Sequence, residues 1–145
     1  MATAGGPDGT ALPHVKPHEA ESAQHFIRRW AAEETRMQNT GRTAAYLAMS
    51  KDCSGCRHLA STIHGYFAAG GHVHTAGWRL DSIDAPPSAT GVVTYYVTAQ
   101  AAPMTIQESS STSVEHIPGR PVRYLVSVLV RPGSGSFTVT SRTLA

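Results

Sequence analysis

The clearest local signal for chemistry in the sequence is the pair Cys53 and Cys56, with two residues between them. A Cys-x-x-Cys pair at the start of a helix can exchange thiols and disulfides, because the helix N-terminus and basic neighbours stabilise a thiolate. A thioredoxin-like pair, however, follows a strand within a βαβ unit. Here a short helix is predicted before Cys53, and the motif lacks the usual Trp and Pro. This context disfavours redox catalysis.

Three other interpretations of the cysteine pair remain: a zinc site, a structural disulfide, or two free buried thiols. His72 and His74 would complete a set of four zinc ligands, but only one residue separates them, which is unusual for a Cys2His2 site. Two cysteines and no others form an even pair, which suits an oxidising compartment. If Asp52 caps the next helix, the cysteines lie one turn apart, near the Cα separation that a disulfide needs. We therefore expect a disulfide between Cys53 and Cys56, and no bound metal.

Candidate acid–base residues are scattered. His64 borders the apolar stripe of the third predicted helix, and a histidine there is more often a structural group than a catalytic one. Asp81 and Asp84 lie near the end of the first predicted strand, where an isomerase-like site could place a base. No Asp–His pair shares a helix or strand face, and the motifs of nucleotide-binding, serine-hydrolase and metalloprotease sites are absent. We assign no catalytic residue and expect no cofactor.

Three helices are predicted first along the chain. Residues 18–39 have a helical apolar period, residues 42–49 form a shorter helix, and Asp52 can cap a third helix that ends at Gly70-Gly71. The first of these is the most regular, with apolar positions that form a single stripe: Ala23, Phe26, Ile27, Trp30, Ala31 and Met37.

After Gly71 the apolar period changes from helical to alternating, which predicts strands. The expected strands cover residues 73–83, 92–101, 104–108, 121–131 and 136–144. Helices that precede a meandering antiparallel sheet indicate an α+β fold, with three N-terminal helices packed on a curved sheet, rather than a doubly wound parallel sheet. Residues 1–17 are rich in Gly, Pro and Thr without an apolar period, so we expect a flexible lead before one domain at residues 18–145.

Composition limits the classes of function. The chain has 145 residues, of which only 15% are charged, and its net charge is +2. This weak, dispersed charge gives no footprint for nucleic acid. No apolar run is long enough to span a bilayer, and no signal peptide is visible. Either the protein is cytoplasmic, or a native export segment is absent from residues 1–145.

The order of these elements resembles the nuclear transport factor 2-like superfamily, a cone-shaped α+β roll. The resemblance covers about residues 18–144 and rests on a long first helix with Phe26 and Trp30, the segment NTGRTAAYLAMS, a third helix ending in Gly-Gly, and the closing strands LVSVLVRPGSGSFTVTS. More narrowly, TGRTAAYLAMSKDCSGC, YFAAGG and a Trp-bearing strand resemble an actinobacterial domain family of unknown function, whose members are typically lipoproteins or secreted proteins.

The resemblance implies a curved sheet around a cavity whose mouth is closed by helices. The side chains that we expect to line this cavity are Trp30, Tyr46, His64, Trp78, Asp81 and Tyr96. If the cavity were catalytic, His64 or Asp81 would carry the reaction. Proteins with this fold have many different functions, so the resemblance does not identify the function of this chain.

Three hypotheses about function follow. The first is a non-catalytic extracytoplasmic domain, secreted or tethered at the cell surface by a removed lipid anchor. It would bind a protein, a cell-wall component or a small ligand, and could form a homodimer through its sheet. The alternatives are a pocket enzyme of the isomerase or dehydratase type, and a cytoplasmic interaction module.

Overall fold

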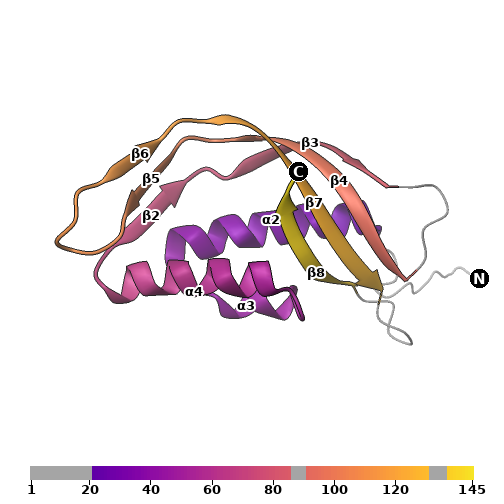
Figure 1. Ribbon diagram of the computed structural model, residues 1–145, viewed down its shortest axis with the longest axis horizontal. Coiled ribbons are helices and arrows are strands. Elements are labelled where there is room, and N and C mark those ends of the chain that lie inside the picture. The colour runs from indigo at the N-terminus through magenta and orange to yellow at the C-terminus, as the bar shows by residue number, and fades with distance from the viewer. Residues whose placement is uncertain (1–20, 86–90, 131–136) are drawn as a thin grey trace, which may run out of the picture.

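The computed structural model describes residues 21–85, 91–130 and 137–145. The predicted flexible lead, residues 1–17, lies outside them. Three helices, α2 (Ala23–Thr40), α3 (Ala44–Ala48) and α4 (Ser54–Ala68), lie on one side of a layer of antiparallel strands that arches over them (Figure 1). This architecture confirms the predicted α+β class.

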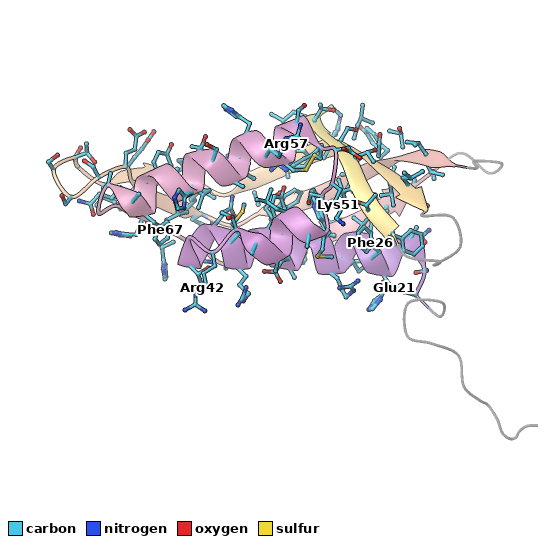
Figure 2. The ribbon with its side chains drawn as sticks, turned by 90° about the horizontal axis from the view of Figure 1, so that it is seen from below. Glu21, Phe26, Arg42, Lys51, Arg57 and Phe67 are labelled. Carbon is cyan, nitrogen blue, oxygen red and sulfur yellow. A yellow bond between two sulfur atoms is a disulfide. The ribbon has the colours of Figure 1, made fainter. Side chains whose placement is uncertain are left out.

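Helix α2 is set by its caps and its apolar stripe. The Ser22 hydroxyl accepts a hydrogen bond from the His25 amide at 3.1 Å, and Gly41 ends the helix with a φ of 74°. Such a left-handed residue is the usual C-terminal stop, and glycine adopts it without steric cost. The predicted apolar positions Phe26, Ile27 and Trp30 are all buried. Helices α2 and α4 lie side by side beneath the sheet (Figure 2).

The N-terminal cap of α4 differs from the prediction. Cys53, rather than Asp52, is the capping residue, and its sulfur accepts the hydrogen bond of the Cys56 amide at 3.1 Å. Asp52 instead has a φ of 64°, a left-handed conformation that Asp tolerates better than most residues. The tight turn between α3 and α4 therefore uses Asp52 for its backbone and Cys53 for its cap.

The strands form two sheets. The three-stranded sheet has the order β2 (His72–Thr75), β5 (Met104–Gln107) and β6 (Glu115–Ile117). The four-stranded sheet has the order β3 (Trp78–Asp84), β4 (Val92–Ala101), β7 (Arg120–Val130) and β8 (Phe137–Leu144). All pairs in both sheets are antiparallel. The prediction of one strand over residues 73–83 was wrong, because this segment forms β2 and β3. Strand β6 was not predicted.

A single bend separates the two sheets. It crosses the chain at Gly77, at Ala102-Pro103 and at Pro118-Gly119, between the register Thr75–Met104–Ile117 on one side and Trp78–Ala101–Arg120 on the other. Gly77 has a φ of 91°, and a side chain there would collide with the Thr35 hydroxyl of α2. Glycine is therefore required where the bent sheet approaches the helix.

The core lies between the helices and the inner face of the sheet. It combines Trp30 and Met37 of α2 with Val97, Val126 and Val139 of the four-stranded sheet, all at most 1% exposed. Within the described residues, no helix is long and apolar enough to cross a membrane.

Candidate functional site

A cavity of about 130 Å³ lies beneath the bend, between α2 and both sheets. Its walls come from segments far apart in the sequence, because the bend brings the ends of six strands, β2 to β7, over the C-terminal half of α2. The lining residues are Glu34 and Gln38 of α2, Thr75, Gly77, Trp78, Ala101, Ala102, Met104, Ile117, Arg120, Val122 and Tyr124 around the bend, and Arg142 of β8.

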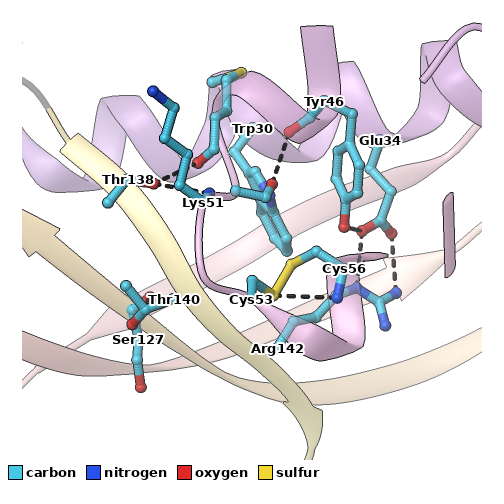
Figure 3. Close-up of a disulfide and its surroundings, with 12 residues drawn as sticks. Trp30, Glu34, Tyr46, Lys51, Cys53, Cys56, Ser127, Thr138, Thr140 and Arg142 are labelled. Carbon is cyan, nitrogen blue, oxygen red and sulfur yellow. Dashed lines mark hydrogen bonds and ion pairs between the residues drawn. A yellow bond between two sulfur atoms is a disulfide. The ribbon is translucent and has the colours of Figure 1, made fainter. Parts of the chain in front are cut away.

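The charged centre of this site is a buried ion pair between α2 and β8. Glu34 is 0% exposed, and its two carboxylate oxygens accept hydrogen bonds from Nε and Nη2 of Arg142 at 2.8 and 2.9 Å. The Tyr46 hydroxyl donates a third hydrogen bond to Glu34 Oε1 at 2.8 Å. Figure 3 shows this arrangement. The planar guanidinium matches a carboxylate in this two-pronged geometry, which is among the strongest that side chains form.

The electrostatics reinforce the pairing. Burial works to lower the pKa of Arg142, but the adjacent Glu34 carboxylate outweighs it, so the pKa is raised and the guanidinium stays charged. Burial, followed by the Glu34 charge, raises the pKa of Tyr46 beyond its usual range, so this hydroxyl stays protonated and donates. The Arg142 guanidinium also lies 4.8 Å from the Tyr124 ring and 5.6 Å from the Trp78 ring, within cation–π distance.

The Glu34 carboxylate already accepts hydrogen bonds from its protein neighbours. Glu34 is the only carboxylate that lines the cavity in the described part of the chain, and three donors already satisfy it. A general base must reach a substrate proton with a free lone pair near neutral pH. Glu34 is therefore a poor base, and neither a histidine nor a cysteine lines the cavity among these residues.

One turn further along α2, the side chain of Gln38 is buried like that of Glu34 but is not fully hydrogen-bonded. It lines the same cavity and is only 7% exposed, yet its Oε1 atom is buried without a hydrogen-bond partner in the structure described here. Its neighbour Asn39, by contrast, binds the backbone of Thr75 through both ends of its amide, at 2.8 and 2.9 Å. Buried polar atoms are nearly always paired, so an unpaired one requires an explanation.

Three of the six predicted lining residues lie at or next to the cavity. Trp78 lines it. Trp30 and Tyr46 are 0% exposed, and they stack on each other at 5.9 Å rather than forming the wall. Trp30 donates its indole hydrogen to the Ser50 hydroxyl at 3.0 Å, so its polar atom is also satisfied. These two aromatic residues support the site from within the core.

The other three predicted lining residues lie elsewhere, and this corrects the expectation. His64 is exposed on α4, and Tyr96 is 39% exposed on the outer face of the sheet. Asp81 is exposed too, and it pairs with Arg79 at 3.2 Å. The β-strand alternation explains both sheet residues, because Tyr96 follows the buried Tyr95 and Asp81 follows Leu80, which packs on the core. The hypothesis that His64 or Asp81 acts in the cavity is therefore not supported.

The cysteines form the expected disulfide. Cys53 and Cys56 are joined with Cα atoms 5.2 Å apart, and both are 0% exposed (Figure 3). His72 and His74 are exposed on β2. Within the described ranges no group of three or more metal-binding side chains comes together. The bridge pins the turn between α3 and α4, away from the cavity lining.

Sequence reasoning missed Glu34, Gln38 and Arg142. A signal for Glu34 was present, since it occupies the apolar stripe between Trp30 and Met37 at helical spacing. An acid at such a position must be buried, and a buried acid requires a cationic partner. No comparable signal identifies Arg142, because it lies 108 residues away and the sequence contains many arginines.

Comparisons with known proteins agree with the fold only. No protein-family model and no curated protein matches the sequence. The crystal structure of the intermembrane space region of the chloroplast protein ARC6 has a TM-score of 0.59 at 10% identity, and the match covers 91% of this chain and 98% of that one.

Two bacterial structures are also similar. A putative aromatic ring hydroxylase from Novosphingobium aromaticivorans has a TM-score of 0.54 at 10% identity, covering 82% of this chain and 85% of that one. The beta subunit of the benzoate 1,2-dioxygenase from Burkholderia mallei has a TM-score of 0.52 at 8% identity, covering 85% and 89%. What these structures share with the chain is the fold, an α+β roll with helices packed on a curved, mainly antiparallel sheet. Membership of the nuclear transport factor 2-like superfamily stays a prediction. Membership of the actinobacterial lipoprotein family stays a prediction.

Proposed function

We propose that this chain is a non-catalytic binding domain of an extracytoplasmic protein, which holds a small ligand in the cavity beneath the bend of its sheet. The observation that carries the proposal is that the Glu34 carboxylate is already hydrogen-bonded within the protein. Arg142 and Tyr46 donate three hydrogen bonds to the one carboxylate that lines the cavity in the described residues, and the Arg142 cation pairs with its charge. A site with this arrangement can hold a molecule but lacks a free base to react with it.

Binding, unlike catalysis, needs only a cavity of defined shape with a few oriented polar groups. The cavity has such walls, with apolar side chains such as Met104, Ile117 and Val122 around the amide of Gln38. The ion pair fixes α2 against β8, so these walls are held before a ligand arrives. A preformed site loses less conformational entropy when it binds.

The disulfide supports an extracytoplasmic location, because structural disulfides persist in oxidising compartments and are rare in reducing ones. The similar domain of ARC6 lies in an intermembrane space, which agrees with this location without establishing it. A lipid anchor or secretion, and contact with a cell-wall component, stay predictions within this proposal.

To distinguish catalysis from binding, the protein is incubated with single-ring compounds. For each sample, one NMR spectrum records the amides of the protein and a second records the resonances of the compound. We expect amide shifts in residues around the cavity, with the compound's own spectrum unchanged over days. New compound resonances that form in the wild type but not in Glu34→Gln would contradict the proposal and favour the isomerase or dehydratase alternative. A set of compounds that shifts no cavity amide would also contradict it.

The location is tested by trapping thiols in the native host with a maleimide that adds a measurable mass. We expect both cysteines to be unreactive unless a reductant is added. Two reactive thiols in freshly lysed cells would instead support the cytoplasmic interaction module.

Self-association through the sheet is a further part of this proposal. On the outer face of the four-stranded sheet, Tyr96 and Leu125 are paired across β4 and β7 and are 39% and 37% exposed. We expect a concentration-dependent dimer by light scattering, which the double variant Tyr96→Lys and Leu125→Lys would convert to a monomer. A wild type that stays monomeric at millimolar concentration would exclude this contact.

A further inference from the structure

The lining of the cavity carries a net positive charge. Three charged side chains line it in the described part of the chain: Glu34, Arg120 and Arg142. Glu34 and Arg142 neutralise each other in their ion pair, whereas Arg120 makes no ion pair to the described residues. One cation is therefore left over, and a site with a positive lining attracts an anionic ligand.

The alternation of β7 places Arg120 on the cavity side of the sheet. Val122 and Val126 are buried and Tyr124 is half-buried, whereas the residues between them are exposed. Side chains two residues apart lie on the same face of a strand, so Arg120 belongs to the inner face with these three. It is the first residue of β7, at the point where the strand leaves the bend.

Arg120 also marks the mouth of the cavity. Among the described residues that line the cavity, it alone is exposed, and the others are buried or half-buried. The cavity therefore opens to solvent beside this side chain. A charged group bound there keeps part of its hydration, which avoids most of the desolvation cost that a fully buried charge incurs.

The volume restricts what can lie deeper in the cavity. An engineered cavity of roughly 150 Å³ with apolar walls takes up benzene, and the present volume of about 130 Å³ is close to that. The apolar surface around it comes from Trp78, Met104, Ile117 and Val122. A single six-membered ring matches both this volume and these walls.

An apolar interior with one unpaired arginine at its mouth fits a molecule that has an apolar ring and one negative charge. We propose that the cavity binds a single-ring monocarboxylate, whose ring packs against Met104, Ile117 and Val122 while the Arg120 guanidinium donates hydrogen bonds to its carboxylate. A planar guanidinium matches a carboxylate in two-pronged geometry. This inference rests on the proposed binding function and names the ligand class of the same site.

The test compares benzoate with benzamide, which has nearly the same shape and no charge, at neutral pH and low salt. Amide chemical shifts of the full chain are followed during titration with each compound. We expect benzoate to bind at least about fivefold more tightly, because a partly exposed charge pair contributes a modest free energy. Acetate, which has the carboxylate without the ring, should bind at least about tenfold more weakly than benzoate, since it buries far less apolar surface.

Arg120→Gln tests the cation at the mouth, and Arg123→Gln is its matched control. Arg123 is exposed on the outer face of the same strand, so both variants remove one positive charge but only the first alters the cavity. We expect Arg120→Gln to bind benzoate and benzamide equally, and Arg123→Gln to keep the wild-type preference. Arg120→Lys should restore part of the preference, because it restores the charge without the two-pronged geometry.

A further variant places the ring in the cavity independently of Arg120. Ala102→Leu adds bulk to the strand side of the cavity and leaves the arginine in place. We expect it to weaken the binding of benzoate and benzamide alike by at least about tenfold, since filled volume excludes both rings. Full binding of benzoate by this variant would place the ligand elsewhere and overturn the inference.

Other results distinguish the inference from the function on which it rests. Equal affinity of the wild type for benzoate and benzamide, or acetate bound as tightly as benzoate, would overturn the monocarboxylate inference. A preference for benzoate that survives in Arg120→Gln, or that is lost equally in Arg123→Gln, would overturn the role of Arg120. If neither ring compound shifts the cavity amides but another small molecule does, the inference fails and the binding function stands. If no compound does, both fail.

Discussion

Glu34 and Gln38 lie one turn apart on the same face of α2, and they contrast a paired with an unpaired buried polar group in one helix. Glu34 is a buried charge with three donors, two from β8 and one from α3. Gln38 is a buried neutral amide whose oxygen has no partner among the described residues. The first ties three elements together, whereas the second makes no hydrogen bond through its oxygen to the described residues.

The difference shows that a polar residue in a cavity is not by itself a sign of catalysis. A buried carboxylate that is fully hydrogen-bonded contributes to one arrangement of its neighbours and is unavailable for chemistry. A buried acceptor without a partner lowers the stability of the folded protein.

The largest expected effect comes from breaking the ion pair. Arg142→Met removes both donors from β8 and leaves Glu34 buried without its cation, which should lower the free energy of unfolding by about 3–5 kcal/mol. Chemical denaturation measures this change. The matched control is Glu33→Gln, which removes the exposed pair with Arg36; it should change stability by less than about 0.5 kcal/mol. Similar losses in both variants would mean that Glu34 is no more structural than a surface acid.

The disulfide gives the next largest effect, and it should leave the cavity unaltered. A bridge that closes so short a loop stabilises the fold by about 2 kcal/mol in the chain-entropy model. Cys53→Ser with Cys56→Ala removes the bridge but keeps an oxygen that can cap α4, whereas Ala at both positions removes the bridge and the cap. We expect thermal melts to show the second variant less stable by roughly a further 1 kcal/mol. The amide chemical shifts of the residues that line the cavity should stay unchanged, and changes there would couple the two regions.

Tyr46→Phe tests the third donor to Glu34. Losing a hydrogen bond to a charged group should lower stability at neutral pH by about 2 kcal/mol. The wild-type pKa of Tyr46 is raised above 10.0, its ordinary value, so the native state keeps this proton where the unfolded chain loses it. This contribution is therefore complete below pH 10 and declines as the pH rises further.

The pH dependence of unfolding shows whether the effect of Tyr46→Phe comes from a buried, protonated hydroxyl. The stability difference between wild type and Tyr46→Phe should shrink above pH 10 when unfolding is measured from pH 8 to pH 11. Tyr96→Phe, with its exposed ring, should follow the wild type throughout. A difference that stays constant up to pH 11 would argue against a buried, protonated Tyr46.

The sequence predicted the helices better than the site. The stripe of Phe26, Ile27 and Trp30 follows a helical period over several turns, and such local patterns survive folding. The break at Gly77 was missed because alternation continues on both sides of it, and only contact with Thr35 of α2 makes glycine necessary there. Local periodicity carries no information about such a contact.

The site itself depends on contacts between distant segments. Trp78 was identified correctly, whereas His64 and Asp81 were chosen for their chemistry and proved to be exposed. The ion pair of Glu34 and Arg142 joins α2 to the last strand. Residue types alone do not reveal which arginine pairs with which acid. Glu34 could have been found from its place in the apolar stripe, but the unpaired state of Gln38 depends on the whole cavity.

The most direct test of the account is the stability of Gln38→Met measured without ligand. If Gln38 Oε1 is unpaired, replacing the amide with an apolar side chain of similar shape should raise the free energy of unfolding by about 1 kcal/mol. The melting temperature should then rise by roughly 3 °C for a domain of this size. A loss of stability of similar magnitude would show that the amide is already hydrogen-bonded in the free protein, and the contrast between Glu34 and Gln38 would fail.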